Sequence, residues 1–189
     1  MNAYLTSPLT FLISTLFSLY ILLVMLRFLL QLVRADFYNP LSQFIVKLTN
    51  PPLRPLRRFI PGWRGLDIAS LLLMLLLQFL SSTLVIALAG QPLEPVGLLI
   101  VSLAQLVDSG FNVFIFAILI QVVLSWVNPG AHSPISSLLF SLTRPVLGPA
   151  QRLLPPIGGI DLSPLVALLG LQVLRMLVMP LFGALVNLT

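Results

Sequence analysis

Few side chains of this chain could do chemistry, because only 8% of its 189 residues are charged and none is a cysteine. The informative ones lie inside long apolar stretches, where a charged or amide group must be paired or functional. Their chemistry would be hydrogen bonding, ion pairing or contact with a solute. These residues are Arg27, Gln78, Asp108, Gln121, Gln172 and Arg175.

No catalytic or metal-binding arrangement can be assembled from the polar residues. The single histidine, His132, supplies neither the usual number of zinc ligands nor a paired haem ligation. The sequence contains no glycine-rich nucleotide-binding motif, and no serine, histidine and aspartate share one depth. We therefore expect a protein that is not an enzyme and that binds no cofactor or metal.

Four apolar stretches must position the polar residues. Each contains about 20 or more mostly apolar residues, the length that crosses a bilayer. Hydrophobic residues make up 58% of the chain, which leaves too little polar surface for a water-soluble domain. The sequence predicts an all-α membrane protein. Its transmembrane helices are expected at about 9–33, 68–89, 102–127 and 164–186, and 96–107 either extends the third or forms a separate interfacial helix.

The basic residues lie in two of the connections between these stretches. Six of the ten lie between Arg34 and Arg64, and two more are Arg144 and Arg152. Residues 1–8 and 90–101 contain none. Short connections rich in Lys and Arg stay in the cytoplasm, so both termini and the 91–101 connection are expected outside. The net charge of +5 then reflects topology, and we expect no nucleic-acid partner.

An internal repeat relates the two halves of the chain at a constant offset of 94 residues. Between 40–78 and 134–172, 15 of 39 aligned positions are identical. Each copy contains two predicted spans, an even number, so we expect parallel repeats rather than the inverted repeats of many transporters. The predicted organisation is a first repeat at 1–90, an outside connection at 91–101 and a second repeat at 102–189.

The repeat suggests contacts for the polar residues inside the spans. Arg27 corresponds to Gln121, which favours an interior contact shared by both copies, although the long Arg27 side chain could also snorkel to the headgroups. Gln78 corresponds to Gln172. Their amides are expected to hold helices together by hydrogen bonds across the pseudo-symmetry axis, with Gln121 or Arg27 as partner. The alternative is that they contact a solute.

Arg175 is the costliest side chain of the sequence if it faces lipid, because it lies near the middle of its span. Asp108 is the only acidic residue inside a predicted span. An ion pair between them would require Arg175 to reach outward. A partner subunit or an oligomer interface is the alternative way to satisfy the guanidinium.

Each repeat carries an amphipathic segment between its spans, at 41–61 and 135–155. Apolar residues recur there at i, i+3, i+4 and i+7. Pro51 and Pro145 follow helix-capping residues, so we predict that one short helix ends there and a second begins, forming a helical hairpin. The apolar stripes are Leu41, Phe44, Ile45 and Leu48 in the first copy, and Ile135, Leu138, Leu139 and Leu142 in the second.

Three interpretations of the hairpins are open. They could lie on the anionic inner leaflet, provide a docking platform for a partner protein, or re-enter the membrane to line a pore. The residues expected to face headgroups or a partner are Lys47, Arg54, Arg57, Arg58, Arg144 and Arg152. Asp67 and Asp161 directly precede the next apolar stretches, and we expect both to be helix N-caps.

The chain resembles the YggT family of bacterial membrane proteins, in its two-repeat form. The resemblance rests on RPVLGPAQRLLPPIGGIDLSP at 144–164, NPPLRPLRRFIP at 50–61 and DFYNPLSQF at 36–44. It implies a bacterial inner-membrane protein linked to osmotic-stress tolerance, with plastid relatives linked to membrane-complex biogenesis and nucleoid distribution. The family has no catalytic residues to carry over. Gly148 and Gln151 stand where the first copy has Arg54 and Arg57.

The sequence therefore favours a non-enzymatic inner-membrane scaffold, assembly or envelope stress-tolerance protein that acts through its amphipathic hairpins. Its expected partners are anionic lipids and either further copies of itself or another membrane protein. The alternative is an oligomeric channel for small ions or solutes, or a regulator of ion flux.

Overall fold

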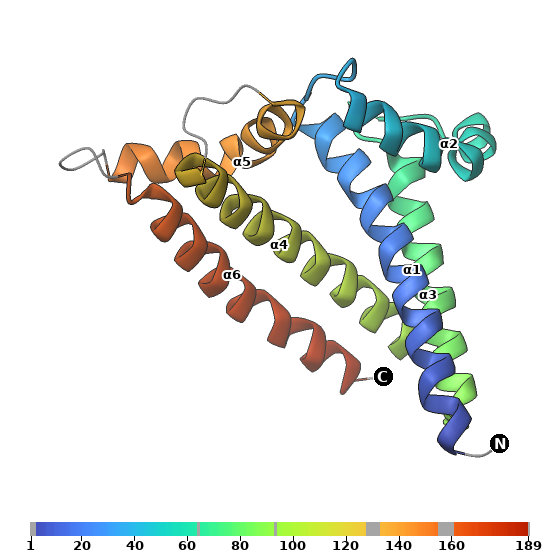
Figure 1. Ribbon diagram of the computed structural model, residues 1–189. Coiled ribbons are helices and arrows are strands. Elements are labelled where there is room, and N and C mark those ends of the chain that lie inside the picture. Colours follow the sequence, from blue (N-terminus) through green and yellow to red (C-terminus); the bar gives the residue numbers. More distant parts are fainter. Residues whose placement is uncertain (1–2, 64, 93, 128–132, 155–160, 189) are drawn as a thin grey trace.

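The computed structural model describes residues 3–63, 65–92, 94–127, 133–154 and 161–188. Within these ranges the chain is helical apart from turns, bends and one isolated β-bridge between Trp63 and Leu66. The helices, in chain order, are α1 (Ala3–Leu32), α2 (Pro40–Phe59), α3 (Ile68–Leu88), α4 (Pro95–Val127), α5 (Pro134–Leu153) and α6 (Ser163–Val186) (Figure 1).

Four helices are long and apolar enough to cross a membrane, which confirms the expected number of spans. The segments that qualify have mean hydropathies between 2.1 and 2.4. They are Thr6–Leu32, Ile68–Leu88, Pro95–Val127 and Ser163–Val186.

Helix α4 is continuous over 33 residues, so 96–107 extends the third span and is not a separate interfacial helix. The helix begins at Pro95, earlier than the predicted residue 102, which makes the connection before it shorter than 91–101. Proline is a favoured first residue of a helix, because the amide hydrogen it lacks would have no partner there. At 1.5 Å per residue α4 is about 50 Å long, more than a bilayer core requires. Such a helix fits by tilting.

The helices form two pairs that meet at an angle. Helix α1 packs on α3 and α4 packs on α6, while contacts of α3 and α1 with α4 join the pairs. Figure 1 shows α4 and α6 inclined to α1 and α3. It also shows α2 and α5 lying across one end of the pairs, with both chain termini at the other end. The two basic segments are therefore neighbours.

The predicted break inside each amphipathic segment is wrong, because α2 and α5 are each a single helix of 20 residues. Helix α2 runs through Pro51, Pro52 and Pro55. A proline inside a helix removes one hydrogen bond and crowds the preceding turn, which bends the helix without having to end it. Figure 1 shows both helices changing direction along their length.

The predicted apolar stripe of α2 is only partly buried. Its buried residues are Ser42, Ile45, Thr49 and Leu53, which lie on one face. Leu41, Phe44 and Leu48 flank that face and are exposed. Helix α2 therefore packs one edge of its apolar side on the spans and leaves the other edge uncovered.

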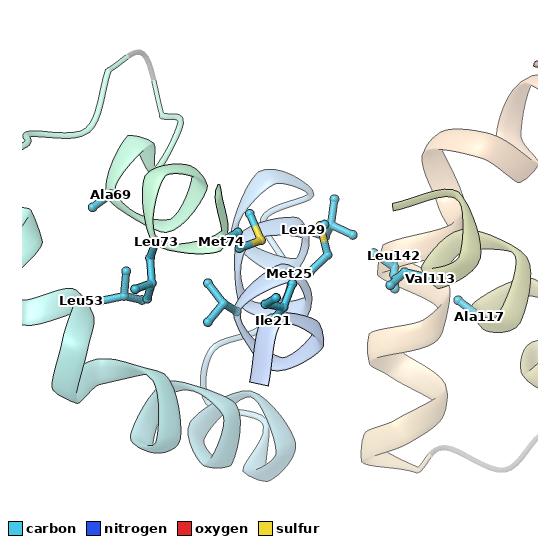
Figure 2. Packing of buried hydrophobic residues seen from close by; sticks show 11 residues of the cluster. Ile21, Met25, Leu29, Leu53, Ala69, Leu73, Met74, Val113, Ala117 and Leu142 are labelled. Carbon is cyan, nitrogen blue, oxygen red and sulfur yellow. The ribbon is translucent and has the colours of Figure 1, made fainter. Parts of the chain in front are cut away.

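The main hydrophobic cluster joins α1 to every other helix except α6. Leu53 of α2, with no exposed surface, packs with Leu73 of α3 and with Ile21 and Met25 of α1. Figure 2 shows these side chains together, with Val113, Ala117 and Leu142 on the far side of α1. A smaller cluster holds α5 on α4 and α6, and consists of Ile118, Leu147, Ala150 and Ala167. Both amphipathic helices are thus docked through apolar contacts.

Asn39 connects the beginnings of the two amphipathic helices. It is the N-cap of α2, where its Oδ1 accepts a hydrogen bond from the Leu41 amide at 2.9 Å. Its Nδ2 donates to the Pro134 carbonyl at 2.7 Å and to Ser137 Oγ at 3.2 Å, both in the first turn of α5. The Asn39 side chain is buried, and its bonds to α5 are partly shielded from water.

Candidate functional site

Arg27 is buried against the first amphipathic helix. Only 5% of the residue is exposed, so it does not snorkel to the headgroups. Its Nη1 donates to Thr49 Oγ1 at 2.8 Å and to the Val46 carbonyl at 3.4 Å, both on α2. The Thr49 hydroxyl in turn donates to the Ile45 carbonyl at 2.7 Å, one turn earlier. We call the bond between Arg27 and Thr49 the first threonine contact.

The second repeat contains the equivalent contact with a neutral partner and in the opposite direction, because the Thr143 hydroxyl donates to Gln121 Oε1. Gln121 on α4 is hydrogen-bonded to Thr143 on α5, and these residues correspond to Arg27 and Thr49 at the offset of 94. Thr143 has no exposed surface, and its hydroxyl lies 2.9 Å from the Leu139 carbonyl, as Thr49 lies beside Ile45. Each repeat therefore ties its amphipathic helix to its first span through a buried threonine.

A second repeated contact ties the end of each amphipathic helix to the beginning of the next span. Asp67 is the N-cap of α3, and its carboxylate accepts from the amide and hydroxyl groups of Ser70. The same carboxylate forms an ion pair with Arg57, in the last turn of α2. Arg57 therefore pairs with a carboxylate of its own chain, whereas the sequence predicted that it faces headgroups or a partner.

Asp161 was predicted to be an N-cap, and this is wrong because the cap of α6 is Leu162. The Asp161 carboxylate instead accepts from the Ser163 amide at 2.8 Å, one residue before the position of a capping side chain. Gln151 Nε2 donates to Asp161 Oδ2 at 3.4 Å. Gln151 and Asp161 correspond to Arg57 and Asp67, so the second copy keeps the contact between the end of its amphipathic helix and this aspartate, without the charge pair.

Both of these carboxyl groups have a pKa below the ordinary value of an aspartate. Burial raises the pKa of Asp67, but hydrogen bonds from Arg57 and Ser70 and the charge of Arg57 outweigh it and leave the pKa below its ordinary value. The pKa of Asp161 is lowered mainly by its hydrogen bond from Ser163, which exceeds the opposing effect of burial.

Arg175 finds its partner inside the chain. Its Nε and Nη2 donate to the two carboxylate oxygens of Asp108 at 2.6 Å and 2.8 Å, in the paired geometry that suits a guanidinium and a carboxylate. Asn112 accepts from Arg175 Nη1 at 3.3 Å and donates to Asp108 Oδ2 at 3.1 Å. This cluster joins α4 to α6 at membrane depth, and of the two alternatives the pairing with Asp108 is the one observed.

The two duplicated glutamines lie in different surroundings. Gln78 Nε2 donates to Gln105 Oε1 at 2.6 Å, and Ser82 Oγ donates to the same oxygen at 3.1 Å. Gln172 is exposed on α6. The expected contact of Gln78 with Gln172, Gln121 or Arg27 is therefore wrong. Helix α3 is rotated so that Gln78 faces Gln105 on α4. Gln105 lies outside the aligned part of the repeat, so the repeat did not indicate it.

A polar cavity surrounds Gln78 between α1, α3 and α4. It has a volume of about 380 Å³. A second cavity of about 510 Å³ is mostly apolar, shares Ser18, Gln78 and Ser109 with the first, and reaches Leu142 of α5. The polar lining of the first cavity consists of Ser14, Ser18, Gln78, Ser81, Ser82, Gln105, Asp108 and Ser109.

Five basic side chains remain on the outer faces of α2 and α5. In the part of the chain that the structure describes, only Arg57 and Arg175 form ion pairs. Those on α2 and α5 that are exposed and have no acidic partner in these ranges are Lys47, Arg54, Arg58, Arg144 and Arg152, and Arg34 between α1 and α2 is a sixth such residue. These side chains are free to meet an anionic surface.

The described residues contain no cluster of side chains that could bind a metal ion. Among them, no three or more His, Asp or Glu side chains gather closely enough to hold an ion. His132 lies outside these residues.

Sequence reasoning missed four of the residues that build the site. Thr49 and Thr143 were visible as identical positions of the repeat, and their equal spacing from Arg27 and Gln121 could have identified both contacts. Gln105 and Asn112 carry no such signal. Their roles depend on how α4 is rotated against its neighbours, which periodicity does not reveal in an almost uniformly apolar helix.

The charge difference between the two threonine contacts predicts unequal effects of the same substitution. Thr49→Val leaves a buried guanidinium with one long hydrogen bond, whereas Thr143→Val leaves a neutral amide. Hydrogen bonds to charged groups contribute about 1.5–3 kcal/mol and neutral ones about 0.5–1.5 kcal/mol, so we expect Thr49→Val to cost about 1 kcal/mol more. Unfolding of the purified protein in detergent measures both. Thr83→Val is the control, because the Thr83 hydroxyl bonds to Phe79 of its own helix; equal losses at 49 and 143 would contradict the prediction.

The lowered pKa of Asp67 predicts a loss of stability in acid that depends on Arg57. A carboxyl group with a lowered pKa in the folded state stabilises fully above its unfolded pKa of about 3.9, and this stabilisation is lost as the pH falls from that value through the lower pKa of the folded state. Arg57→Gln, which copies the second repeat, should reduce stability at pH 7 and weaken its decline between about pH 5 and pH 3. Unfolding across this pH range tests it, with exposed, unpaired Arg58→Gln as control. An unaltered decline in Arg57→Gln would refute the assignment.

Similarity to known proteins covers both halves of the chain. The family model described as CCB3/YggT matches residues 6–88 and again residues 100–182. No solved structure matches the chain.

Bacterial relatives match over most of their length, and all three named here are described only as uncharacterized. A protein of Pseudomonas aeruginosa is 48% identical over 170 residues, which cover 89% of this chain and 86% of the relative. One from Vibrio alginolyticus is 42% identical over 179 residues, covering 94% and 96%. YggT of Escherichia coli is 40% identical over 171 residues, covering 90% and 88%. With both halves matched, the chain belongs to the CCB3/YggT family.

Proposed function

We propose that the protein is a non-enzymatic scaffold of the bacterial inner membrane that acts through α2 and α5. Its two repeats lie parallel, with both termini and the connection before α4 outside and the two amphipathic helices in the cytoplasm. Among the described residues, the exposed basic side chains without an ion pair lie on α2 and α5, with Arg34 just before α2. This supports the orientation, because basic connections are retained inside. The place of both helices at one end of the spans agrees with it (Figure 1).

The observation that carries the proposal is the division of α2 into a docked edge and an uncovered edge. Thr49 and Leu53 fasten the helix to the spans, while Leu41, Phe44 and Leu48 are exposed beside Lys47 and Arg54. An apolar edge next to basic side chains is the pattern of a helix that lies in the membrane interface. Each basic residue there adds about 1 kcal/mol of attraction to anionic lipids.

A scaffold of this kind holds a second membrane protein, or further copies of itself, against the inner leaflet. The process it serves is envelope tolerance to osmotic stress or the assembly of a membrane complex, as its family suggests. Gln172 and the large apolar residues around it on α6 are exposed, which offers a helix face to such a partner.

Neutralising the outward basic residues tests the proposal. A variant carrying Lys47→Gln, Arg54→Gln, Arg58→Gln and Arg152→Gln should fail to restore growth after osmotic upshift in a strain that lacks its own copy. Arg57 is left unchanged because its ion pair with Asp67 belongs to the fold. A topology reporter at the C-terminus verifies insertion. Full restoration of growth by this variant would disprove the proposal.

A charge-conserving control separates lipid from protein recognition. Replacing Arg54, Arg58 and Arg152 with Lys preserves the attraction to headgroups but removes the planar guanidinium groups. Photo-crosslinkers at positions 47 and 152, followed by quantitative mass spectrometry, report the partner directly. A stoichiometric second protein identifies the partner of the scaffold. Self-crosslinks of defined order without one indicate either a scaffold of identical copies or the channel described below, and the flux assay separates the two.

The alternative function is an oligomeric channel for small ions or solutes, or a regulator of ion flux. The two cavities that share Gln78 favour it, because together they extend from Val85 and Val101 to Leu142 beneath α5. The mostly apolar lining of the second cavity would act as a barrier to ions until it is wetted.

Flux through proteoliposomes distinguishes this alternative. Gln78→Leu and Gln105→Leu remove the amides that line the polar cavity, and each should lower flux several-fold if the cavity is part of a path. Gln172→Leu is a matched control, because the same change is made on α6 outside both cavities. Flux that is absent in the wild type, or equal in all variants, would exclude this function.

A further inference from the structure

We infer that α5, unlike α2, carries a discrete binding site for a phosphate group between Arg144 and Arg152. The inference rests on the proposed function, in which both amphipathic helices face anionic headgroups. It goes further because it assigns one headgroup-sized site to one repeat, in place of a diffuse attraction along both.

The site is a hollow on the outward face of α5. Its volume is about 380 Å³. Ser141, Arg144, Gly148 and Arg152 line it at i, i+3, i+7 and i+11, which places them on one face of the helix, and Val33 at the end of α1 closes one side. The buried residues Leu142, Leu147 and Ala150 belong to the opposite face, which packs on the spans. The hollow is therefore accessible while the helix stays docked.

Gly148 creates the space between the two arginines. A Cβ atom added to this residue would meet nothing within 4 Å. The corresponding residue of the first repeat is Arg54, a third large cation that would fill the hollow and repel its neighbours. Glycine within a helix costs about 1 kcal/mol relative to alanine, so Gly148 weakens α5 without gaining any packing contact. An open cavity is what this residue provides.

The charges around the hollow select an anion. Arg144 and Arg152 are exposed, and neither forms an ion pair within the described residues. They are eight residues apart, about 12 Å along a helix, with Gly148 midway, so their long side chains can converge on one group above it. Guanidinium groups bind phosphate oxygens through paired hydrogen bonds. The hollow exceeds the size of a single phosphate, which leaves room for the glycerol of a lipid headgroup.

Binding of phosphate by the full-length protein tests the site in two arms. In the first, the detergent-purified protein is titrated with phosphatidylglycerol and the bound lipid is counted by native mass spectrometry. In the second, inorganic phosphate is added to the protein in phosphatidylcholine nanodiscs, and its binding is followed by ³¹P NMR. The variants are the double Arg144→Gln/Arg152→Gln and the single Gly148→Leu, which fills the hollow without changing charge.

Two controls match these variants. Arg54→Gln/Arg58→Gln removes the same charge from α2, and Gly170→Leu adds the same side chain at an open glycine of α6. Two basic residues at about 1 kcal/mol each correspond to binding about 30-fold weaker in the double variant. Gly148→Leu should weaken binding at least about ten-fold. In the phosphate arm both controls should change binding less than about two-fold, because the diffuse attraction of α2 acts on an anionic membrane surface, which phosphatidylcholine does not supply.

The outcomes separate the site from the proposed function. Selective loss in the lipid arm alone identifies a lipid headgroup as the ligand, and selective loss in the phosphate arm identifies phosphate from solution. Equal losses in both arginine pairs, or unchanged binding in Gly148→Leu, would overturn the inference. These binding results do not depend on the growth assay, because that assay tests the scaffold function and not phosphate binding at the hollow.

Discussion

A guanidinium group inside a bundle of apolar helices must find its hydrogen-bond acceptors within the protein, because lipid offers none. Arg27 meets this requirement on α2, and much of the structure follows from it. Thr49 can reach Arg27 only if α2 folds back against the end of α1. That docking sets the rotation of α2, which places Leu53 in the main core and leaves Lys47 and Arg54 facing outward. The buried charge of Arg27 thus determines which side of α2 faces outward.

The two repeats share a framework but distribute charge differently. Three of the positions where the first copy has arginine and the second does not belong to the contacts above: Arg27 and Gln121, Arg57 and Gln151, and Arg54 and Gly148. The first two replacements keep a hydrogen bond to the same partner position, Thr143 and Asp161. The third opens a hollow. The first amphipathic helix is accordingly held by charged contacts, whereas the second is held by neutral ones and presents a cavity.

The sequence was sufficient for the features that depend on composition and on the repeat. Hydropathy located four spans, and the match at 67 and 161 placed a carboxylate before each second span. The sequence was insufficient for contacts that depend on how one apolar helix is rotated against another. This rotation brings Gln78 to Gln105 and leaves Gln172 exposed. Local proline chemistry also misled, because Pro51 bends α2 where an isolated segment would stop. At Asp161 a shift of one residue was enough to move the cap to Leu162.

Asn39 provides a second connection between the two helix pairs, besides the peptide chain. The peptide chain joins the two helix pairs at the end where α3 leads into α4, and Asn39 joins them again at the opposite end through Pro134 and Ser137. Two helix pairs joined at both ends resist being spread apart, since widening the angle between them breaks two hydrogen bonds. The same link couples α2 to α5, so that a displacement of one helix is transmitted to the other.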